Sequence, residues 1–515
     1  MRRPCPRPNR AFLCAVLVWG GAALGAETLA DAHPPLSDPH LDAPARTASE
    51  RARIKAVVTP TADFSAPEPF EARPAGAATV APVPGPHVFD QPSAGIDGEA
   101  RMTWHLGQAL FDKLWVPSPS STRGSDGLGP LYNARSCRAC HLRDGRGHTP
   151  DADGAVSMFL RISVPADPGA GMPAIADWIA TRPDPVYGGQ LQDFAAVGHR
   201  AEYRLDVRYD EIAVALSGGD RAYLRKPAYT AADLGYGPLT PGAMLSPRVA
   251  PQMIGLGLLE AIPAAQITAR ADPRDADGDG ISGRAAIVWS DQYDRPMLGR
   301  FGWKGGEPTL REQAAAAFSG DIGISTWLNP QPWGDCSAAQ DDCRTARHGV
   351  DADGAELPRD ALEAVLHYTR NLGVPARRAP GDPEVLRGKR VFHDTGCTAC
   401  HTPKHVTARL SGQPAQSFQL IWPFTDLLLH DMGDGLADNR PEGRATGREW
   451  KTPPLWGIGL TGQVSGHTQY LHDGRARSLL EAVLWHGGEA RTQRDTVVSM
   501  PPADRDALIR YLESL

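Results

Sequence analysis

Two copies of one five-residue motif carry the most specific chemistry in this sequence. They are Cys137–His141 (CRACH) and Cys397–His401 (CTACH), and both follow the pattern C-x-x-C-H. In that pattern the two thiols attach covalently to a haem and the adjacent histidine ligates its iron. The chain has 8 cysteines and 16 histidines in 515 residues, so only about 0.004 matches are expected by chance. The sequence therefore predicts two c-type haems, with these residues as their ligands: Cys137, Cys140, His141, Cys397, Cys400 and His401.

Other uses of these cysteines fit the sequence less well. A redox-active dithiol is expected in a thioredoxin-like βαβ context, and zinc needs a second matching half-site near each motif. The sequence offers neither of these. Two further cysteines, Cys336 and Cys343, lie in the polar segment GDCSAAQDDC. In an oxidising compartment we expect them to form a local disulfide.

The N-terminus has the layout of a secretory signal peptide. Four arginines precede the apolar run 11–26 (AFLCAVLVWGGAALGA), which ends in small residues. We expect residues 1–26 to be removed, or 1–32 if cleavage follows Ala32. The run is short for a membrane anchor, and no other stretch reaches the ~18 apolar residues that a span requires. These features predict an exported, periplasmic protein whose residues 33–86 form a flexible Pro- and Ala-rich leader.

The overall composition is that of an ordinary globular protein. Of the 515 residues, 41% are hydrophobic and 22% are charged, and the formal net charge is −7. The sequence has no basic cluster of the kind that nucleic acid requires, so nucleic acid is not an expected partner.

Helical periodicity beside each motif suggests how the haems are held. Apolar residues recur at helical spacing over 102–116 and 383–396, just before the two motifs. Further helices are predicted at 361–373 and 504–515. A helix, the haem motif and a closing helix make up a class-I cytochrome c domain. We therefore expect a mainly α fold with two class-I cytochrome c-like haem domains in tandem.

The two predicted domains differ in size. The N-terminal one is expected over 87–378 and the C-terminal one over 379–515. The two motifs lie much farther apart than one small cytochrome requires. The excess, about 150–300, is rich in Gly and Pro and has short strand-like stretches such as SMFLRISV. We interpret it as a large irregular insertion in the first domain.

Several segments, in order, resemble one family of bacterial di-haem enzymes. The segments are NARSCRACHLRDGRG, SPRVAPQMIGLGLLEAIP, LLLHDMGDGLAD and the stretch 451–490 around YLHDGRARSLLEAVLWHGG. They are similar to the di-haem oxidoreductase and peroxidase family, loosely called thiol oxidoreductases. That family is related to the bacterial di-haem cytochrome c peroxidases and to the enzyme MauG. The resemblance covers about 100–515 and implies a haem oxidoreductase.

The resemblance also implies a second axial ligand for the C-terminal haem. In the peroxidases this ligand is a methionine twelve residues after the glycine of an HDG element. The same count from Gly474 ends on His486. We expect His401 and His486 to ligate this haem, which would lower its reduction potential relative to His/Met ligation. His430 and Met432 are the competing candidates, and the alternative for His486 is a surface histidine that ends a helix.

The N-terminal haem is the expected reactive one. The segment 301–324 (FGWKGGEPTLREQAAAAFSGDIGI) resembles the family's segment near that haem. The resemblance places Trp303 between the haems as an electron bridge and Gln313 in the distal pocket. The family's catalytic glutamate falls on Gly323 here. Asp321, two residues earlier, is the expected substitute for moving a proton.

Four other residues have expected roles near the haems. The pair His472 and Asp473 is expected to brace the haem crevice. A sixth ligand for the N-terminal haem could come from His148 or His199, although a solvated loop histidine is the plainer interpretation of each.

Alternating carboxylates suggest a calcium loop. Asp275, Asp277 and Asp279 precede Gly280, as in calcium-binding loops. The twelfth position is Ala286 rather than glutamate, so the loop is not an EF-hand. A shorter calcium loop and a polar surface turn are the two interpretations.

Three functions follow from these features. The first is a cytochrome c peroxidase-like enzyme that takes electrons from a small redox protein, a cytochrome c or a cupredoxin, and passes them to hydrogen peroxide. The second is MauG-like oxidation of an organic or protein substrate. The third is an electron-transfer cytochrome without substrate chemistry. Trp303 and Gln313 favour the first two, and the missing glutamate favours the third.

Overall fold

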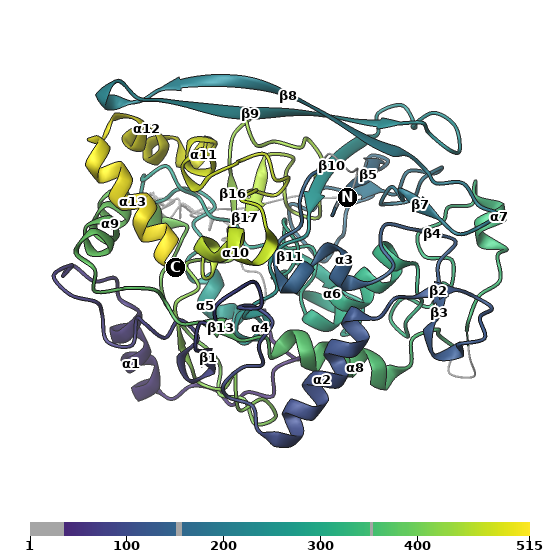
Figure 1. The fold of residues 1–515 in the computed structure, drawn as a ribbon, viewed down its shortest axis with the longest axis horizontal. Coiled ribbons are helices and arrows are strands. Elements are labelled where there is room, and N and C mark those ends of the chain that lie inside the picture. The colour runs from purple at the N-terminus through teal and green to yellow at the C-terminus, as the bar shows by residue number, and fades with distance from the viewer. Residues whose placement is uncertain (1–35, 151–156, 351–353) are drawn as a thin grey trace, which may run out of the picture. The chain divides into compact units, whose positions relative to one another are not determined.

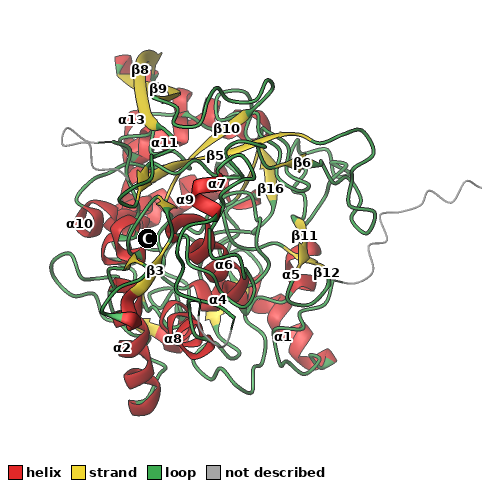
Figure 2. Ribbon diagram, turned by 90° about the vertical axis from the view of Figure 1, so that its right-hand side faces the viewer, coloured by secondary structure: helices red, strands yellow, loops and turns green. Residues whose placement is uncertain are grey.

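The computed structural model describes residues 36–150, 157–350 and 354–515. Helices account for 29% of the chain and strands for 18%, spread over many small sheets. The expected mainly α fold of two class-I cytochrome c-like domains is therefore wrong. The helices beside the motifs do form, but the 54 glycines and 47 prolines of the chain interrupt helical runs elsewhere. Figure 2 shows the many loops that result.

The helices fall at intervals along the whole described chain. Four of them, α2, α8, α9 and α13, are long and lie before and after the two motifs. The bounds of all of them are α1 Ala48–Val58, α2 Gly98–Asp112, α3 Cys137–Cys140, α4 Leu256–Glu260, α5 Ala264–Thr268, α6 Leu310–Ala317, α7 Asp341–Arg344, α8 Arg359–Arg370, α9 Pro383–Asp394, α10 Thr461–Ser465, α11 Leu479–Leu484, α12 Arg491–Ser499 and α13 Pro502–Ser514.

The long helices cross in two similar pairs, α2 on α8 and α9 on α13. A glycine lies at each crossing. A Cβ added to Gly107 would collide with the Ala364 carbonyl, and one added to Gly388 would collide with the Ala507 carbonyl. Glycine therefore lets the two backbones approach closely in both pairs.

An aromatic pair next to each crossing packs toward a motif histidine. Phe111 lies 5.2 Å from Tyr368 and 6.2 Å from His141, measured between ring centroids. In the second pair the corresponding contacts join Phe392 to Tyr511 at 5.3 Å and to the motif histidine, His401, at 6.4 Å. Both crossings thus position a C-x-x-C-H histidine in the same way.

The strands of the described chain form seven two-stranded sheets and one three-stranded sheet. Only β1–β13 and β2–β3 are parallel. The pairs are β1 Thr79–Val80 with β13 Val374–Pro375, β2 Val116–Pro117 with β3 Asp126–Leu128, β4 Leu131–Tyr132 with β7 Phe194–Ala195, β5 Met158–Pro165 with β6 Thr181–Arg182 and β10 Met244–Val249, β8 Arg204–Ala215 with β9 Arg221–Ala232, β11 Ile287–Ser290 with β12 Arg295–Leu298, β14 His405–Val406 with β15 Leu420–Ile421, and β16 Leu429–Asp431 with β17 Glu449–Lys451.

The longest hairpin, β8–β9, covers a helix from the other end of the chain. Its register pairs Arg204 with Ala232 and Ala215 with Arg221, and it runs across the top of Figure 1 above α11 and α12. The backbone N–H of Arg225 donates to Glu481 of α11 at 2.6 Å. Residues from the expected insertion therefore help to position the segment that carries His486.

Residues 36–86, which we expected to be a flexible leader, are folded. They contain α1 and β1, and β1 pairs with β13. Arg46 donates to the carbonyls of Val406 and Thr407 at 2.6 and 3.0 Å. The composition of this segment did not show that residues more than 300 positions away satisfy its polar groups.

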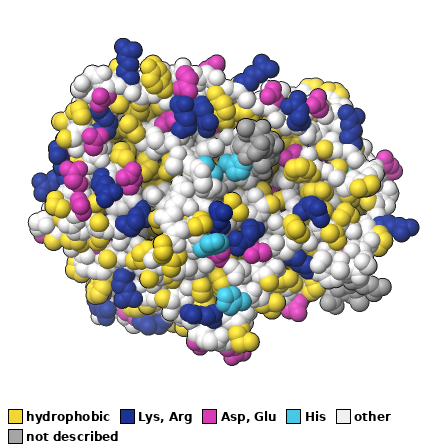
Figure 3. Space-filling model, in the orientation of Figure 1, with side chains coloured by type: hydrophobic (Ala, Val, Ile, Leu, Met, Phe, Trp, Pro, Cys, Tyr) yellow, Lys and Arg dark blue, Asp and Glu magenta, His cyan; other side chains and the backbone are white. Residues whose placement is uncertain are grey.

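The predicted signal peptide lies outside the described residues. Within those residues, no helix is both long enough and apolar enough to cross a membrane. Residues 36–515 cluster as one unit, and the boundary at 378/379 stays a prediction. On the face shown in Figure 3, basic and acidic side chains are interspersed with apolar ones.

Candidate functional site: two cavities that share a wall

Each C-x-x-C-H motif forms a tight turn beside a cavity. The first turn is α3, with His141 as its C-terminal cap, and the second is the 3-10 turn Cys397–Ala399 followed by Cys400 and His401. All four thiols are free of disulfide bonds. Burial is the main cause that raises the pKa of Cys137 and of Cys397 to about 12. Each motif thus offers two unpaired sulfurs and one imidazole to the same cavity.

The first cavity has a volume of about 450 Å³ and is partly open to solvent, and Cys137, Cys140 and His141 line it. The Nδ1–H of His141 donates to the Pro251 carbonyl at 2.9 Å. Nε2 is therefore the ring nitrogen that can ligate iron. Burial lowers the pKa of His141 to about 4, so the ring is neutral, as ligation requires.

The second cavity has a volume of about 200 Å³ and is partly open to solvent, and among the histidines that line it two have similar hydrogen bonds. The Nδ1–H of His401 donates to the Phe424 carbonyl at 3.0 Å, and that of His486 donates to the Ala482 carbonyl at 2.8 Å. Burial, and next the proximity of His486, lower the pKa of His401 to about 4. Two neutral imidazoles therefore share this cavity, each with Nε2 left for a metal.

His430, one competing ligand, has both ring nitrogens engaged. Nδ1 lies 2.8 Å from Oε2 of Glu489, and Nε2 lies 2.9 Å from Oδ2 of Asp426. Burial opposes the charged ring, but these hydrogen bonds outweigh it and hold the pKa of His430 well above its usual value. A doubly protonated ring has no lone pair for iron. The other competitor, Met432, also lines the cavity.

The two cavities meet at a shared wall. Five residues line both of them, namely Arg146, Trp303, Lys451, Pro453 and Pro454. Trp303 is 8% exposed, and its Nε1–H donates to the Val249 carbonyl at 2.9 Å. Trp303 thus lines both cavities, and its role as an electron bridge between haems stays a prediction.

His472 and Asp473 lie at this wall with different partners. The ring of His472 stacks on Trp450 at 3.7 Å between centroids and meets Trp303 edge-on at 6.5 Å. Asp473 pairs with Arg475 at 2.7 Å and accepts a hydrogen bond from the Tyr229 hydroxyl at 2.8 Å. Both residues are buried and His472 lines the second cavity, while the bracing role expected of the pair stays a prediction.

Gln313 and Asp321 both line the first cavity. Gln313 lies on α6, and Asp321 lies on the π-helical turn Phe318–Ile322 that follows it. Asp321 Oδ1 accepts a hydrogen bond from Gln190 Nε2 at 2.8 Å. Burial raises the pKa of Asp321, and Arg161 and the Gln190 hydrogen bond oppose that shift. The cavity therefore combines an amide and a proton-binding carboxyl with the His141 imidazole.

The position of the family's glutamate has no room for a side chain. Gly323 has φ 78°, and a Cβ there would lie 2.6 Å from the Cα of Gly129. Left-handed backbone and close contact both exclude a larger residue. This explains why a carboxyl can enter the cavity from Asp321 but not from Gly323.

Sequence reasoning missed most charged residues of the first cavity, and Glu307 and Arg161 are two of them. Glu307 lies in the same segment as Trp303, and the glycines at 302, 305 and 306 that precede it could have indicated a tight turn. Arg161 lies in SMFLRISV, where one charge interrupts an apolar strand. A lone charge in such a strand is a signal for a polar cavity.

Neither proposed sixth ligand lies at the first cavity. His141 is the only histidine among the described residues that line it. The Nδ1 of His148 lies 2.7 Å from the Thr149 carbonyl, and the ring packs on His467. His199 lies in a loop outside both linings.

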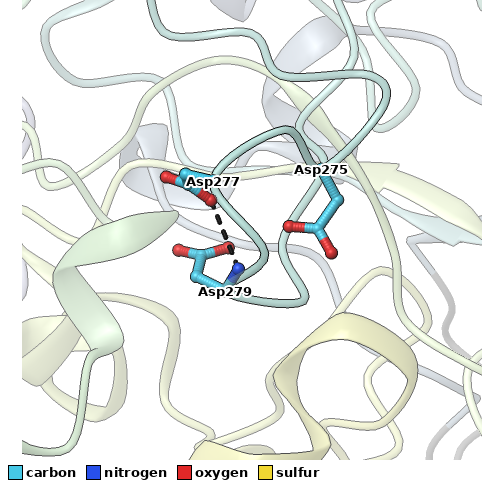
Figure 4. A group of neighbouring side chains, drawn as sticks. All are labelled: Asp275, Asp277 and Asp279. Atoms are coloured by element: carbon cyan, nitrogen blue, oxygen red, sulfur yellow. Dashed lines mark hydrogen bonds between the residues drawn. The ribbon is translucent and has the colours of Figure 1, made fainter.

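The three aspartates of the predicted calcium loop do lie together. One ligand oxygen from each of Asp275, Asp277 and Asp279 lies within 4.8 Å of the others (Figure 4). Several of these oxygens already accept backbone hydrogen bonds, such as that from Ile281 N to Asp279 Oδ1 at 2.8 Å. Those bonds also suit a polar turn, so calcium stays a prediction. The expected disulfide between Cys336 and Cys343 is present.

The residues present fit haem c. In each cavity two unpaired thiols and a histidine with a fixed Nδ1 face a largely apolar space, which is the donor set that this cofactor needs. Two such cavities with a common wall define a class of redox protein with two haem sites.

The comparison with protein families shows which family of that class the chain belongs to. The chain belongs to the family described as "Di-haem oxidoreductase, putative peroxidase", whose model matches residues 71–515. It is therefore a di-haem oxidoreductase. A search of curated proteins found no match to the chain.

Proposed function

We propose that this protein is a periplasmic peroxidase that reduces hydrogen peroxide with electrons from a small redox protein, a cytochrome c or a cupredoxin. Its two haems would be covalently bound, one through Cys137 and Cys140 and the other through Cys397 and Cys400. The haem of the first cavity is the reactive one, and the haem of the second cavity relays electrons. The Asp275 loop is the proposed place for a calcium ion.

The observation that carries this proposal is the difference between the two cavities. The second cavity offers two neutral histidines, His401 and His486, which would saturate an iron and suit electron transfer. The described lining of the first offers one histidine, His141, together with Gln313 and Asp321. An imidazole on one side and proton-handling groups in the same cavity suit substrate chemistry.

The protein's own groups would bind and deprotonate peroxide. When bound, haem would supply the redox chemistry that breaks the O–O bond. The Gln313 amide can hold the peroxide by a hydrogen bond. The Asp321 carboxyl can take its proton, because burial raises its pKa and so its affinity for a proton, while Arg161 and the Gln190 hydrogen bond oppose that shift. Trp303 fills the shared wall, so it is the proposed path for electrons from the second cavity.

The test is the electron paramagnetic resonance and optical spectrum of the purified holoprotein, oxidised and half-reduced, with and without peroxide. We expect one low-spin haem and one high-spin haem whose signal is lost when peroxide is added. Two low-spin haems that do not respond to peroxide in either redox state would contradict the proposal and leave an electron-transfer cytochrome.

A further inference from the structure

The proposed mechanism leaves two carboxyls of the first cavity without a role, Glu442 and Glu307. Glu307 ends the loop that begins at Phe301, and the two residues are joined by backbone hydrogen bonds of 2.9 and 3.3 Å. Gly302 and Gly305, with φ 77° and 67°, allow the chain to reverse between them. The same short loop thus presents Trp303 to the shared wall and Glu307 to the first cavity.

Glu307 differs from the carboxylates around it in its lack of partners. In the described structure its side chain makes no hydrogen bond and no ion pair. By contrast, Glu312 accepts from Ser290 and from its own helix cap, and Glu442 pairs with Arg248 at 2.7 Å. Asp321 is held by Gln190. Glu307 is partly buried and lines the first cavity. A cavity carboxyl that no protein group satisfies points to a ligand that completes it.

The charges around Glu307 favour its protonated form. Burial is the largest cause, and repulsion from Glu312 adds to it, so the pKa of Glu307 rises to about 8. Arg161 opposes this shift, while Glu442 and Asp291 reinforce it. Arg248 and Arg440 also line the cavity, but both are paired with Glu442. At neutral pH the Glu307 carboxyl therefore carries a proton that it can donate.

We propose that Glu307 is a second catalytic residue of this cavity, the one that gives a proton to the departing oxygen of hydrogen peroxide. This inference rests on the proposed peroxidase function. Asp321 takes the proton from the peroxide oxygen that does not depart, and the O–O bond breaks. The departing oxygen leaves as water, with its own hydrogen and the proton of Glu307.

The reaction balances with the reductant already proposed. The reduced redox protein supplies two electrons by way of the haems. The remaining oxygen becomes the second water with the proton returned by Asp321 and one proton from solvent. A second solvent proton restores Glu307. Two carboxyls in different environments thus divide the base and acid steps, which a single glutamate performs in the related peroxidases.

The first test is the reaction of the reduced holoprotein with peroxide, followed by stopped-flow absorption from about pH 5 to about pH 10. We expect the rate constant of the natural protein to fall as the pH rises through about 8, where Glu307 loses its proton. Glu307→Gln has the same shape but no acidic proton. The rate constant of this variant should be smaller by about 100-fold or more, and it should no longer decrease as the pH rises through about 8.

The matched control is Glu363→Gln, which makes the same chemical change at an exposed ion pair with Arg311 on the surface of α8. It should keep both the rate and the pH profile of the natural protein. If Glu307→Gln also keeps them while the natural protein reacts with peroxide, Glu307 has no catalytic role and the proposed peroxidase function still stands. A slower Glu307→Gln that keeps the fall near pH 8 would likewise overturn the inference.

The second test needs no turnover. Fluoride binding to the oxidised holoprotein, followed by haem absorption, should weaken as the pH rises through about 8, because a protonated Glu307 stabilises the anion beside it. Glu307→Gln should bind fluoride with a flatter pH dependence, whereas an unchanged profile would overturn the inference. A natural protein that neither binds fluoride nor reacts with peroxide would overturn the proposed function and this inference together.

Discussion

Hydrogen bonding at single rings separates histidines that the sequence presents as alternatives. His430 holds two carboxylates with its two nitrogens, whereas His486 uses only Nδ1, on the Ala482 carbonyl. Spacing alone made both residues candidate ligands. Only the positions of Asp426 and Glu489 show that the His430 ring is kept protonated and is not available to a metal.

Replacing His486 with methionine tests the ligand of the second haem. We expect His486→Met to keep its haem, because a thioether can ligate the same iron, and to raise the reduction potential of that haem. The ferric spectrum should gain the absorption band of methionine ligation. Spectroelectrochemical titration measures the potential of each haem separately.

The control for this substitution is His199→Gln, since His199 lies outside both cavity linings. It should leave both potentials unchanged. An unchanged potential in His486→Met would instead assign the ligand to another residue, and Met432→Leu would then be the variant that shifts it.

At the scale of elements, the two crossed helix pairs repeat one arrangement in two parts of the chain. Gly107 and Phe111 on α2 correspond to Gly388 and Phe392 on α9. Their partners on α8 and α13 each carry an alanine and, four residues later, a tyrosine. The repeat holds both motif histidines against an aromatic pair.

Adding one methyl group at a crossing should separate the helices. We expect Gly388→Ala to lower the free energy of unfolding by about 1–3 kcal/mol, because the new Cβ meets the Ala507 carbonyl and α9 must move away from α13. Urea unfolding of the holoprotein measures this change, with the haem absorption as the probe.

Gly98→Ala on α2 is the matched control, since a Cβ there has nothing within 4 Å. At such a site alanine should be neutral or stabilise by up to about 1 kcal/mol. Stabilisation of the same size by Gly388→Ala would show that α9 and α13 are not in close contact.

The sequence predicted the helices of this repeat well, because α2, α8, α9 and α13 have clear helical periodicity. It did not predict the sheets, since the pairing of β5 with β10 depends on residues about 80 positions apart along the chain. It assigned the proton-transfer role to Asp321 because that residue lies two positions before Gly323. It missed Glu307, whose position depends on a glycine turn that brings it back beside Phe301.

At the scale of the whole molecule, distant segments are joined through buried charges. Glu71, from the segment expected to be a flexible leader, pairs with Lys389 of α9 at 2.7 Å and also with Arg377. Buried pairs of this kind hold when both partners are present, and losing one partner is strongly destabilising. The composition of residues 33–86 suggested flexibility. It could not show these ion pairs, because the partners lie more than 300 residues away along the chain.

The two cavities share a wall, and replacing Trp303 tests whether electrons cross it. We expect Trp303→Leu to slow electron transfer between the two haems, because it removes the aromatic ring that lines both cavities and contacts His472. Trp303→Phe keeps a ring and should have a smaller effect. Time-resolved absorption after peroxide is added to the fully reduced protein separates the oxidation of the two haems.

The matched control for this experiment is Trp327→Leu. Trp327 packs against Arg359 and lies outside both cavity linings, so its loss should leave the transfer rate unchanged. If the haems exchange electrons equally fast in Trp303→Leu, the path does not run through this side chain. The remaining residues common to both cavities, Arg146, Lys451 and the two prolines, would then be the route to examine. A graded loss from tryptophan to phenylalanine to leucine would instead show that the wall between the cavities conducts electrons through its aromatic ring.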